Sequence, residues 1–347
     1  MSDIQRRKAQ HIELAMDEGS QNGADLWSKY LLPYMALPEV DLDKVDTGAE
    51  LLGKRLKQPL IIASMTGGSQ HAGTINTNLA MAAAKMRVAM GVGSQRVALE
   101  KEEARKTFQA VRKYNPRGVV FANMGAVQLN YGRSIEDYRR VVEMVAADAL
   151  YLHINPLQEA IQPEGDTNWT GLLAKIEKLV KKVGVPVWAK EVGNGLDPVT
   201  AKRLVDIGVT GIDAAGVGGT SWTWIEGRRA GSKNLTKWFS GFGWPTDVLV
   251  PELVKIRKGK REVRIVASGG VRSPVQALKS RLLGADFYSA ARPFLAAALQ
   301  SAEVVERELA DWERGLKIAM FGIGAKDWKE AQKKSLVAQT PLKVSYV

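Results

Sequence analysis

The stretch VRIVASGGVRSPVQALKSRLLGADFYSAARP, residues 263–293, decides the fold of this chain. It opens with a short apolar run and passes through the glycine turn SGGVR, residues 268–272, to Ser273 and Pro274. Proline is favoured at the first position of a helix, so this order predicts a strand, a turn and a helix. A second apolar run at 285–290, closed by Ala-Arg-Pro, predicts another strand and another turn.

The same alternation of a short apolar run and a helical segment runs through the chain from residue 59. Earlier runs lie at 59–64, 89–94, 118–123, 149–155, 185–191 and 211–215. Helical segments are predicted at 76–87, 101–113, 134–147, 170–183, 198–207 and 245–257. The first five separate these runs, and the sixth precedes the last two strands. The runs are continuously apolar, which is typical of parallel strands buried on both faces. Eight such strands alternating with helices predict an α/β fold, the (β/α)8 TIM barrel.

Two extensions flank the predicted barrel, which we assign to residues 59–300. Residues 1–58 are expected to form an arm, with a helix at 4–16 and loops that pack over one barrel end. Residues 301–347 are predicted to form a C-terminal helical extension, with helices at 302–319 and 326–338. Arg7, Lys8 and His11 fall on one face of the first helix, and this pattern by itself favours a solvent-exposed arm.

The composition is that of an ordinary globular protein: 347 residues, 45% hydrophobic, with a net charge of +12 and no Cys. The lack of Cys excludes disulfides, thiolate metal sites and a Cys nucleophile. No apolar run approaches the ~20 residues that span a bilayer, and the polar start has no signal-peptide core. We therefore expect a cytoplasmic protein without a membrane partner. The basic residues are scattered, so we expect no nucleic-acid partner either.

The glycine turn at 268–272 has the features of a phosphate-binding site. Gly269 and Gly270 have no Cβ, so backbone N–H groups can approach an anion. Arg272 adds a forked donor. The alternative is that the glycines simply make a tight turn. Because such barrels often bind phosphate after strands seven and eight, the sequence favours the phosphate site.

Polar, small or glycine residues follow nearly every predicted strand. The C-terminal strand ends of this fold meet at one mouth, so these groups converge there. A large ligand with polar edges and one phosphate, such as FMN, accounts for them. Lys190 would then favour an anionic reduced flavin. The alternative is that Lys190 pairs with a carboxylate such as Asp213.

The segment HINPLQE, residues 153–159, carries an imidazole, two amides and a carboxylate. Glu159 is a candidate ligand for Mg²⁺, which commonly takes one carboxylate together with substrate phosphates. The alternatives are a core histidine at His153 and a helix N-terminal acid at Glu159.

Together these motifs resemble the type 2, FMN-dependent isopentenyl-diphosphate delta-isomerase family over nearly the whole chain. The resemblance rests on Arg7, Lys8, His11, SMTGG at 64–68, GSQR at 93–96, NMGA at 123–126, HIN at 153–155, QE at 158–159, QPEGD at 162–166, KE at 190–191, GGTSW at 218–222 and SGGVR at 268–272. Two places depart from the family pattern: Arg292 stands where Leu is usual, and Asp is usual near Gln276. Gln276 lies inside a predicted helix, and we expect it to matter little.

The resemblance implies an isomerase that interconverts isopentenyl and dimethylallyl diphosphate with reduced FMN and Mg²⁺, without net redox change. It implies NADPH as flavin reductant and a homotetramer or homo-octamer. Implied substrate-binding residues are Arg7, Lys8, His11, Ser94, Gln95, Arg96, Asn155 and Gln158, and the implied metal ligand is Glu159. Implied FMN-binding residues are Ser64, Met65, Thr66, Gly67, Ser94, Asn123, Lys190, Thr220, Gly270, Val271, Arg272, Ala291 and Arg292. Gln158 and His153 are the candidate catalytic residues for proton handling.

The main alternative is an FMN-dependent TIM-barrel oxidoreductase that acts on a phosphorylated substrate. Hydroxy-acid oxidases of this fold use a histidine late in the chain, whereas the histidines here are His11, His71 and His153. Nucleotide reductases of the fold need a catalytic Cys, which this chain lacks. A regulator that only binds flavin would leave Glu159 and the HINPLQE segment unexplained.

Overall fold

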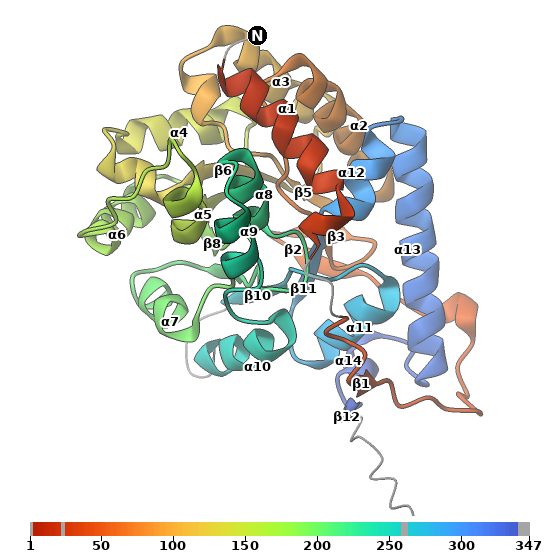
Figure 1. The fold of residues 1–347 in the computed structure, drawn as a ribbon. Helices are drawn as coiled ribbons and strands as arrows, with labels where there is room; N and C mark the ends of the chain where they lie inside the picture. The colour runs from red at the N-terminus through yellow and green to blue at the C-terminus, as the bar shows by residue number, and fades with distance from the viewer. Residues whose placement is uncertain (1–2, 22–24, 258–262, 339–347) are drawn as a thin grey trace, which may run out of the picture.

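A closed barrel of eight parallel strands forms the centre of the molecule (Figure 1). The computed structural model describes residues 3–21, 25–257 and 263–338, without the side chains of residues 3–9 and 70. The barrel strands are β4 (Leu60–Ile62), β5 (Ala89–Gly91), β6 (Val120–Gly125), β7 (Ala149–His153), β8 (Val187–Lys190), β9 (Gly211–Asp213), β10 (Arg264–Ala267) and β11 (Phe287–Ala290). The predicted TIM barrel is confirmed, and each strand lies within its predicted run except β6, which ends two residues later.

Helices surround the barrel and connect its strands. They are α2 (Gln70–Met86), α3 (Glu102–Tyr114), α4 (Ile135–Met144), α5 (Pro156–Ile161), α6 (Leu172–Lys182), α7 (Pro198–Asp206), α10 (Thr246–Arg257), α11 (Pro274–Leu282) and α12 (Arg292–Ala298). Ser273 caps α11 by accepting the backbone N–H of Gln276, and Pro274 begins the helix as predicted. Helix α2 starts earlier than predicted because Ser69 caps it, accepting the backbone N–H of Ala72 at 3.2 Å.

Aromatic rings fill the lower part of the barrel interior. The rings of Phe121 and Tyr151 are stacked with centroids 4.4 Å apart, and Trp188 meets Phe121 edge-on at 5.0 Å. A Cβ at Gly211 would overlap the Trp188 ring, so this glycine makes room for the indole. The interior is therefore a packed core rather than a channel.

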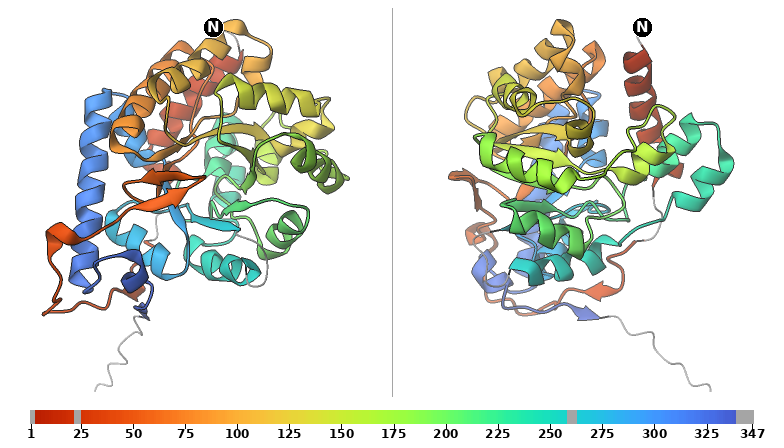
Figure 2. Two further views of the ribbon diagram at one scale, coloured as in Figure 1. Left: turned by 180° about the vertical axis from the view of Figure 1, so that it is seen from behind. Right: turned by 90° about the vertical axis from the view of Figure 1, so that its left-hand side faces the viewer.

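The two ends of the barrel are covered differently (Figure 2). The hairpin of β2 (Ala49–Leu51) and β3 (Lys54–Leu56) lies across the N-terminal end, where its buried leucines join the aromatic core. Helices α1 (Asp3–Met16), α8 (Trp222–Arg229) and α9 (Lys233–Phe239) lie at the opposite end. The N-terminal extension thus reaches both ends of the barrel.

The two extensions meet away from the barrel. Strand β1 (Tyr30–Leu31) pairs antiparallel with β12 (Val337–Ala338). Helix α13 (Ala302–Gly322) packs against α2, α11 and α12. The predicted helix at 326–338 is wrong: only the single turn α14 (Trp328–Ala331) forms before β12, because strand pairing overrides the local helical pattern. Short 3₁₀ turns are η1 (Glu18–Ser20), η2 (Leu42–Lys44), η3 (Arg96–Leu99) and η4 (Ala126–Asn130).

The Gly- and Trp-rich stretch at 216–244 contains two helices that the sequence analysis did not predict. Ser221 caps α8 and Ser232 caps α9, each accepting a backbone N–H three residues later. Arg228 and Arg229 lie in the last turn of α8, where cations are favourable.

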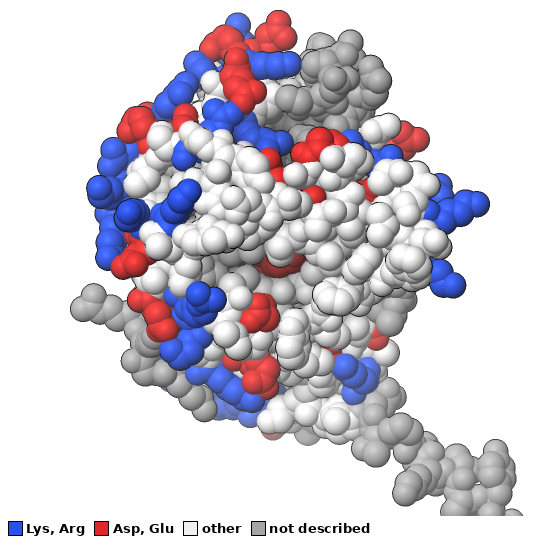
Figure 3. Space-filling view, turned by 60° about the vertical axis from the view of Figure 1, so that its left-hand side comes forward, with Lys and Arg blue, Asp and Glu red and all other residues white. Residues whose placement is uncertain are grey.

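Charged groups are dispersed on the face shown in Figure 3. Lys and Arg lie mainly along its margin, mixed with Asp and Glu, while uncharged residues occupy most of the centre. Within the described ranges, no helix is both long enough and apolar enough to cross a bilayer.

Candidate functional site

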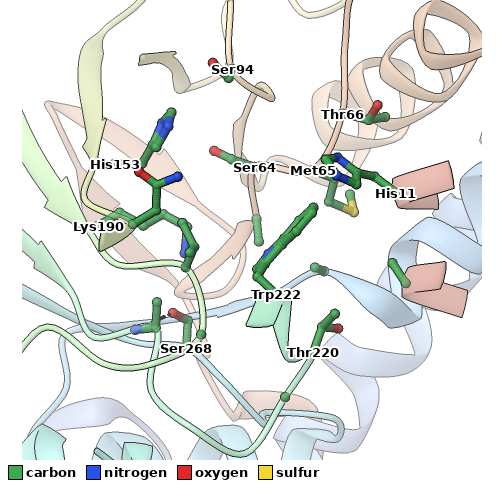
Figure 4. A pocket seen from close by; sticks show the side chains of 18 of the residues that line it. His11, Ser64, Met65, Thr66, Ser94, His153, Lys190, Thr220, Trp222 and Ser268 are labelled. Carbon is green, nitrogen blue, oxygen red and sulfur yellow. Dashed lines mark hydrogen bonds between the residues drawn. The ribbon is translucent and has the colours of Figure 1, made fainter. Parts of the chain in front are cut away.

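A cavity of about 300 Å³ opens at the C-terminal end of the barrel (Figure 4). Its wall takes residues from the segment after every barrel strand and from α1. It brings together most of the predicted site residues: His11, Ser64, Met65, Thr66, Gly67, Ser94, Arg96, Asn123, His153, Asn155, Gln158, Glu159, Lys190, Thr220, Gly270, Val271, Arg272, Ala291 and Arg292. The predicted convergence of strand ends on one mouth is therefore confirmed, while the role of each residue stays a prediction.

Gln95 is the exception among the described residues. It is fully buried, its Nε2 donates to the Val141 carbonyl at 2.8 Å, and its Oε1 accepts the backbone N–H of Asn123 at 2.9 Å. Ser94 and Arg96 line the cavity, whereas Gln95 between them points away from it. The expected substrate contact of the Gln95 side chain is therefore corrected: the amide supports Asn123 from behind.

Arg7 and Lys8 belong to helix α1, but their side chains lie outside the described residues. The prediction that they bind substrate therefore rests on the sequence alone. His11, one turn later, is described and lines the cavity.

The glycine turn after β10 has a backbone that only glycine adopts easily. Gly269 and Gly270 have φ values of +93° and +86°, in the region that disfavours any residue with a Cβ. A Cβ at Gly270 would lie 2.6 Å from the Gly218 carbonyl oxygen. The indole Nε1 of Trp27 donates to the Gly270 carbonyl at 2.9 Å and holds the turn from outside.

Gln276 contributes to the same turn, contrary to the expectation that it matters little. Its Oε1 accepts the backbone N–H of Arg272 at 2.7 Å, and its Nε2 donates to Asp25 at 3.1 Å. The Arg272 guanidinium donates to the Gly218 carbonyl at 2.7 Å. Burial lowers the pKa of Arg272, and Asp25 acts in the opposite direction. The helix position of Gln276 was predicted correctly, but its side chain reaches back to the turn.

Arg292 fastens α1 to the cavity. Its guanidinium donates to the Met16 carbonyl, at the end of α1, at 2.9 Å and to the Glu18 carboxylate at 2.7 and 3.2 Å. A cation at a helix C-terminus satisfies carbonyls that have no partner in the helix. Arg292 thus holds the arm in place, and its contact with FMN stays a prediction.

Lys190 pairs with Asp213, as the alternative interpretation expected, and its role toward FMN stays a prediction. It lines the cavity, and its Nζ lies 3.4 Å from Asp213 Oδ2. Ser268 donates a short hydrogen bond to the other oxygen of Asp213. The buried carboxylate therefore holds the ammonium at the cavity floor.

His153 is held as a neutral imidazole. Burial lowers its pKa to about 3, with Arg96 and Lys190 adding to the effect. Asn123 Nδ2 donates to the Val92 carbonyl at 3.0 Å, so the Asn123 Oδ1 faces His153 Nδ1 at 2.8 Å. Nδ1 then carries the proton, and Nε2 is left as an acceptor. His153 therefore does not act as a cationic acid at neutral pH.

This burial predicts acid sensitivity of the fold. Between pH 6.5 and about 3 the unfolded chain protonates His153 and the folded chain does not. Stability therefore falls as pH drops through this window, by ~1.4 kcal/mol per pH unit well below 6.5. Urea unfolding from pH 6.5 to 4.5 should show a shallower loss for His153→Gln than for the native protein. Equal losses would contradict a neutral imidazole at this position in the folded protein.

The sequence analysis missed a buried carboxylate, Glu226, which contacts both Gln158 and His11. Glu226 of α8 is fully buried, and its Oε1 lies 3.0 Å from both Gln158 Nε2 and His11 Nε2. Arg229 pairs with Oε2 at 2.5 Å. Burial alone would raise the pKa of Glu226, but the bonds from His11, Gln158 and Arg229 outweigh it and lower the pKa.

Trp222 lies on the same helix and projects into the cavity beside His11 (Figure 4). The two rings meet edge-on with centroids 5.0 Å apart. Trp222 and Glu226 are four residues apart, which places them on one helix face. That spacing was visible in the sequence once a helix was recognised there.

Glu159 is positioned by hydrogen bonds to both carboxylate oxygens. Asn155 Nδ2 donates to Oε1 at 2.9 Å, and the backbone N–H of Asp166 donates to Oε2 at 2.8 Å. Asn155 also donates to Gln158 Oε1 at 3.0 Å. Among the described residues no three His, Cys, Asp or Glu side chains form a metal-binding group. A metal here would take Glu159 as a single carboxylate ligand, with other ligands from substrate or water.

The chain is similar to known proteins both in sequence and in fold. Residues 155–338 match the family model for FMN-dependent dehydrogenase. The solved structure of a mandelate oxidase is similar, with a TM-score of 0.65 and 15% identity over 97% of this chain and 99% of that one. A likeness at that identity supports the barrel fold alone.

Closer similarity is found to curated isopentenyl-diphosphate delta-isomerases. The relative from Nostoc sp. is 46% identical over 86% of this chain and 85% of its own. The relative from Synechocystis sp. is 42% identical over 99% and 97%, and that from Ignicoccus hospitalis is 37% identical over 95% and 93%. Identity of this level over almost the full length of the relatives confirms the predicted family. The chain belongs to the FMN-dependent, type 2 isopentenyl-diphosphate delta-isomerase family.

Proposed function

We propose that this enzyme interconverts isopentenyl and dimethylallyl diphosphate, using reduced FMN and Mg²⁺ without net redox change. The observation that carries the proposal is the composition of one cavity. Its wall includes the glycine turn suited to a phosphate, the Glu159 carboxylate, and the amide of Gln158 bonded to buried Glu226. The groups proposed to bind phosphate, to bind metal and to handle protons therefore line the same cavity.

The residues present fit FMN. The hydroxyls of Ser64 and Ser289 are buried in the cavity wall without a hydrogen-bond partner in the described structure, so a ligand can satisfy them. Residues proposed to hold FMN are Ser64, Met65, Thr66, Gly67, Ser94, Asn123, Lys190, Thr220, Gly270, Val271, Arg272, Ala291 and Arg292. When bound and reduced, FMN supplies an electron-rich ring with exchangeable protons on its nitrogens.

The diphosphate is proposed to bind with Mg²⁺ near Glu159. Mg²⁺ is commonly held by one carboxylate and the phosphates of a substrate. Arg96 and His11 lie in the cavity wall. Arg7 and Lys8 belong to α1, the same helix as His11. These four residues are proposed to supply hydrogen-bond donors or positive charge to the negatively charged diphosphate. Ser94, Asn155 and Gln158 complete the proposed substrate set.

Isomerisation adds a proton at one carbon and removes one from another, although the substrate has no acidic C–H. We assign the protein side of this transfer to Gln158, whose amide is fixed by Asn155 on one face and Glu226 on the other. The lowered pKa of Glu226 keeps it anionic. A fixed negative charge stabilises positive charge that develops on the substrate. Neutral His153 serves as a hydrogen-bond acceptor.

The direct test is an anaerobic assay with isopentenyl diphosphate, FMN and Mg²⁺, with and without dithionite. We expect dimethylallyl diphosphate only when the flavin is reduced and Mg²⁺ is present, and EDTA should abolish turnover. One reduction should support many turnovers. Reductant consumed in proportion to product would instead support the alternative, an FMN-dependent oxidoreductase.

Several finer predictions accompany the proposal. NADPH as the reductant can be checked by flavin reduction, and a homotetramer or homo-octamer by light scattering. A cytoplasmic location and the division into an arm (1–58), a barrel (59–300) and a C-terminal extension (301–347) also stay predictions. The absence of nucleic-acid and membrane partners rests on the sequence argument.

A further inference from the structure

The short loop after α5, residues 162–166, begins at the cavity wall with Gln162 and continues behind it. We name it the brace loop. Gln162 reaches the cavity, as do Arg96, Gln128 and Glu159, but Asp166 is not among the residues of the wall. Asp166 therefore acts on a ligand only through the residues that it holds.

Asp166 bonds to three wall residues through two different groups. Its Oδ2 accepts from Arg96 Nη1 at 2.8 Å and from Gln128 Nε2 at 2.7 Å. Its backbone N–H donates to Glu159 Oε2 at 2.8 Å. One residue thus links the proposed diphosphate-binding arginine to the proposed metal ligand.

The bond to Arg96 leaves most of the guanidinium for a ligand. Arginine has five N–H donors, and the contact with Asp166 uses one nitrogen. The Arg96 side chain is 30% exposed and that of Asp166 is 18% exposed. A long side chain loses rotamer entropy when a ligand immobilises it. Because Asp166 already fixes Arg96, that loss is incurred before the substrate binds.

The brace loop itself is tightly fixed. The backbone N–H of Gly165 donates to the Gln162 carbonyl at 3.0 Å. A Cβ on Gly165 would overlap the Glu159 carbonyl oxygen, so the loop lies directly against α5. Glu164 pairs with Arg229 at 2.9 Å, which joins the loop to α8. The position of Asp166 is therefore set from several sides.

We propose that Asp166 is a positioning residue for the substrate diphosphate, and that the brace loop keeps Arg96 and Glu159 at a fixed spacing. The inference rests on the proposed function, because it takes Arg96 as a diphosphate ligand and Glu159 as the metal ligand. It assigns the substrate-binding geometry to a residue that contacts neither substrate nor metal.

Asp166→Asn tests the side-chain link. It removes the charge that orients Arg96 while keeping the size and the backbone N–H. We expect KM for isopentenyl diphosphate to rise about tenfold or more, as a lost charged hydrogen bond implies. The kcat at saturating substrate and the FMN content should change little. By calorimetry, inorganic pyrophosphate with Mg²⁺ should bind more weakly by the same factor.

Asp286→Asn is the matched control. Asp286 has a similar exposure of 17% and pairs with Arg257 at 2.7 Å, but it precedes β11 at the other end of the barrel. Its replacement should lower Tm without changing KM.

Gly165→Ala tests the second link: it displaces the loop from Glu159 and should raise the Mg²⁺ concentration needed for half-maximal activity.

A double-mutant cycle decides whether Asp166 acts through Arg96. If it does, Asp166→Asn combined with Arg96→Gln should raise KM no more than Arg96→Gln alone. Additive effects, or a native KM in Asp166→Asn, would overturn the inference. Failure of the native enzyme to turn over isopentenyl diphosphate would instead overturn the proposed function, so the two failures are distinct.

Discussion

Replacing Gln158 by Ala or Glu is expected to lower kcat for isomerisation by about 10²- to 10⁴-fold, the usual contribution of a proton-handling group. The Gln158 amide is held between Asn155 and the buried Glu226 carboxylate. Ala removes the amide from this network. Glu adds a second carboxylate beside Glu226, and the two negative charges repel in a buried site. Neither change touches the glycine turn, so FMN should stay bound.

The measurement combines single-turnover kinetics with the flavin absorbance of the purified variants. Gln109→Ala on the exposed face of α3 is a suitable control, since it removes an exposed amide that does not line the cavity. The control should keep native kcat and FMN content. Native turnover in both Gln158 variants would remove this residue from proton handling.

Gly270→Ala is expected to produce protein without bound FMN. A residue with a Cβ adopts the native φ of +86° at a cost of about 1–2 kcal/mol. If FMN binding requires this turn, the cost raises the dissociation constant roughly five- to thirtyfold. The added methyl would also press on the Gly218 carbonyl. The dissociation constant of FMN, measured by fluorescence quenching, should therefore rise at least about fivefold.

Gly241→Ala provides the matched control, because a Cβ there meets nothing within 4 Å. It should purify yellow. If Gly270→Ala does not fold, Arg272→Gln tests the same site without changing the backbone and should also weaken FMN. Native affinity in both variants would show that the phosphate is held elsewhere.

The barrel was predictable because its signals are local. Runs such as PLIIAS at 59–64 are apolar throughout, and glycine or proline marks their ends. The glycine turn at 268–272 was identified for the same reason: the required conformation excludes other residues. The polar strand ends followed from the fold, since every βα segment of a barrel opens on one face.

The missed features depend on contacts between distant segments. Glu226 has no local signature of a site residue, because its neighbours His11 and Gln158 come from α1 and α5. Gln95 follows a strand like its neighbours, and only the direction of its side chain separates it from them. Gln276 was dismissed because it lies in a helix, although its amide turns back to Arg272. The local periodicity of the sequence does not predict which distant residues a side chain will contact.

The β2–β3 hairpin closes one end of the barrel, and this has a consequence for the catalytic cycle. The hairpin plugs that end, whereas the cavity lies at the opposite end, beside α1 and α8 (Figure 2). Under the proposed function, substrate and product pass through this same end of the barrel, and they differ only in the position of one double bond. Because both carry the same diphosphate, the shared path favours neither of them, and each is expected to inhibit the conversion of the other by competing for the cavity.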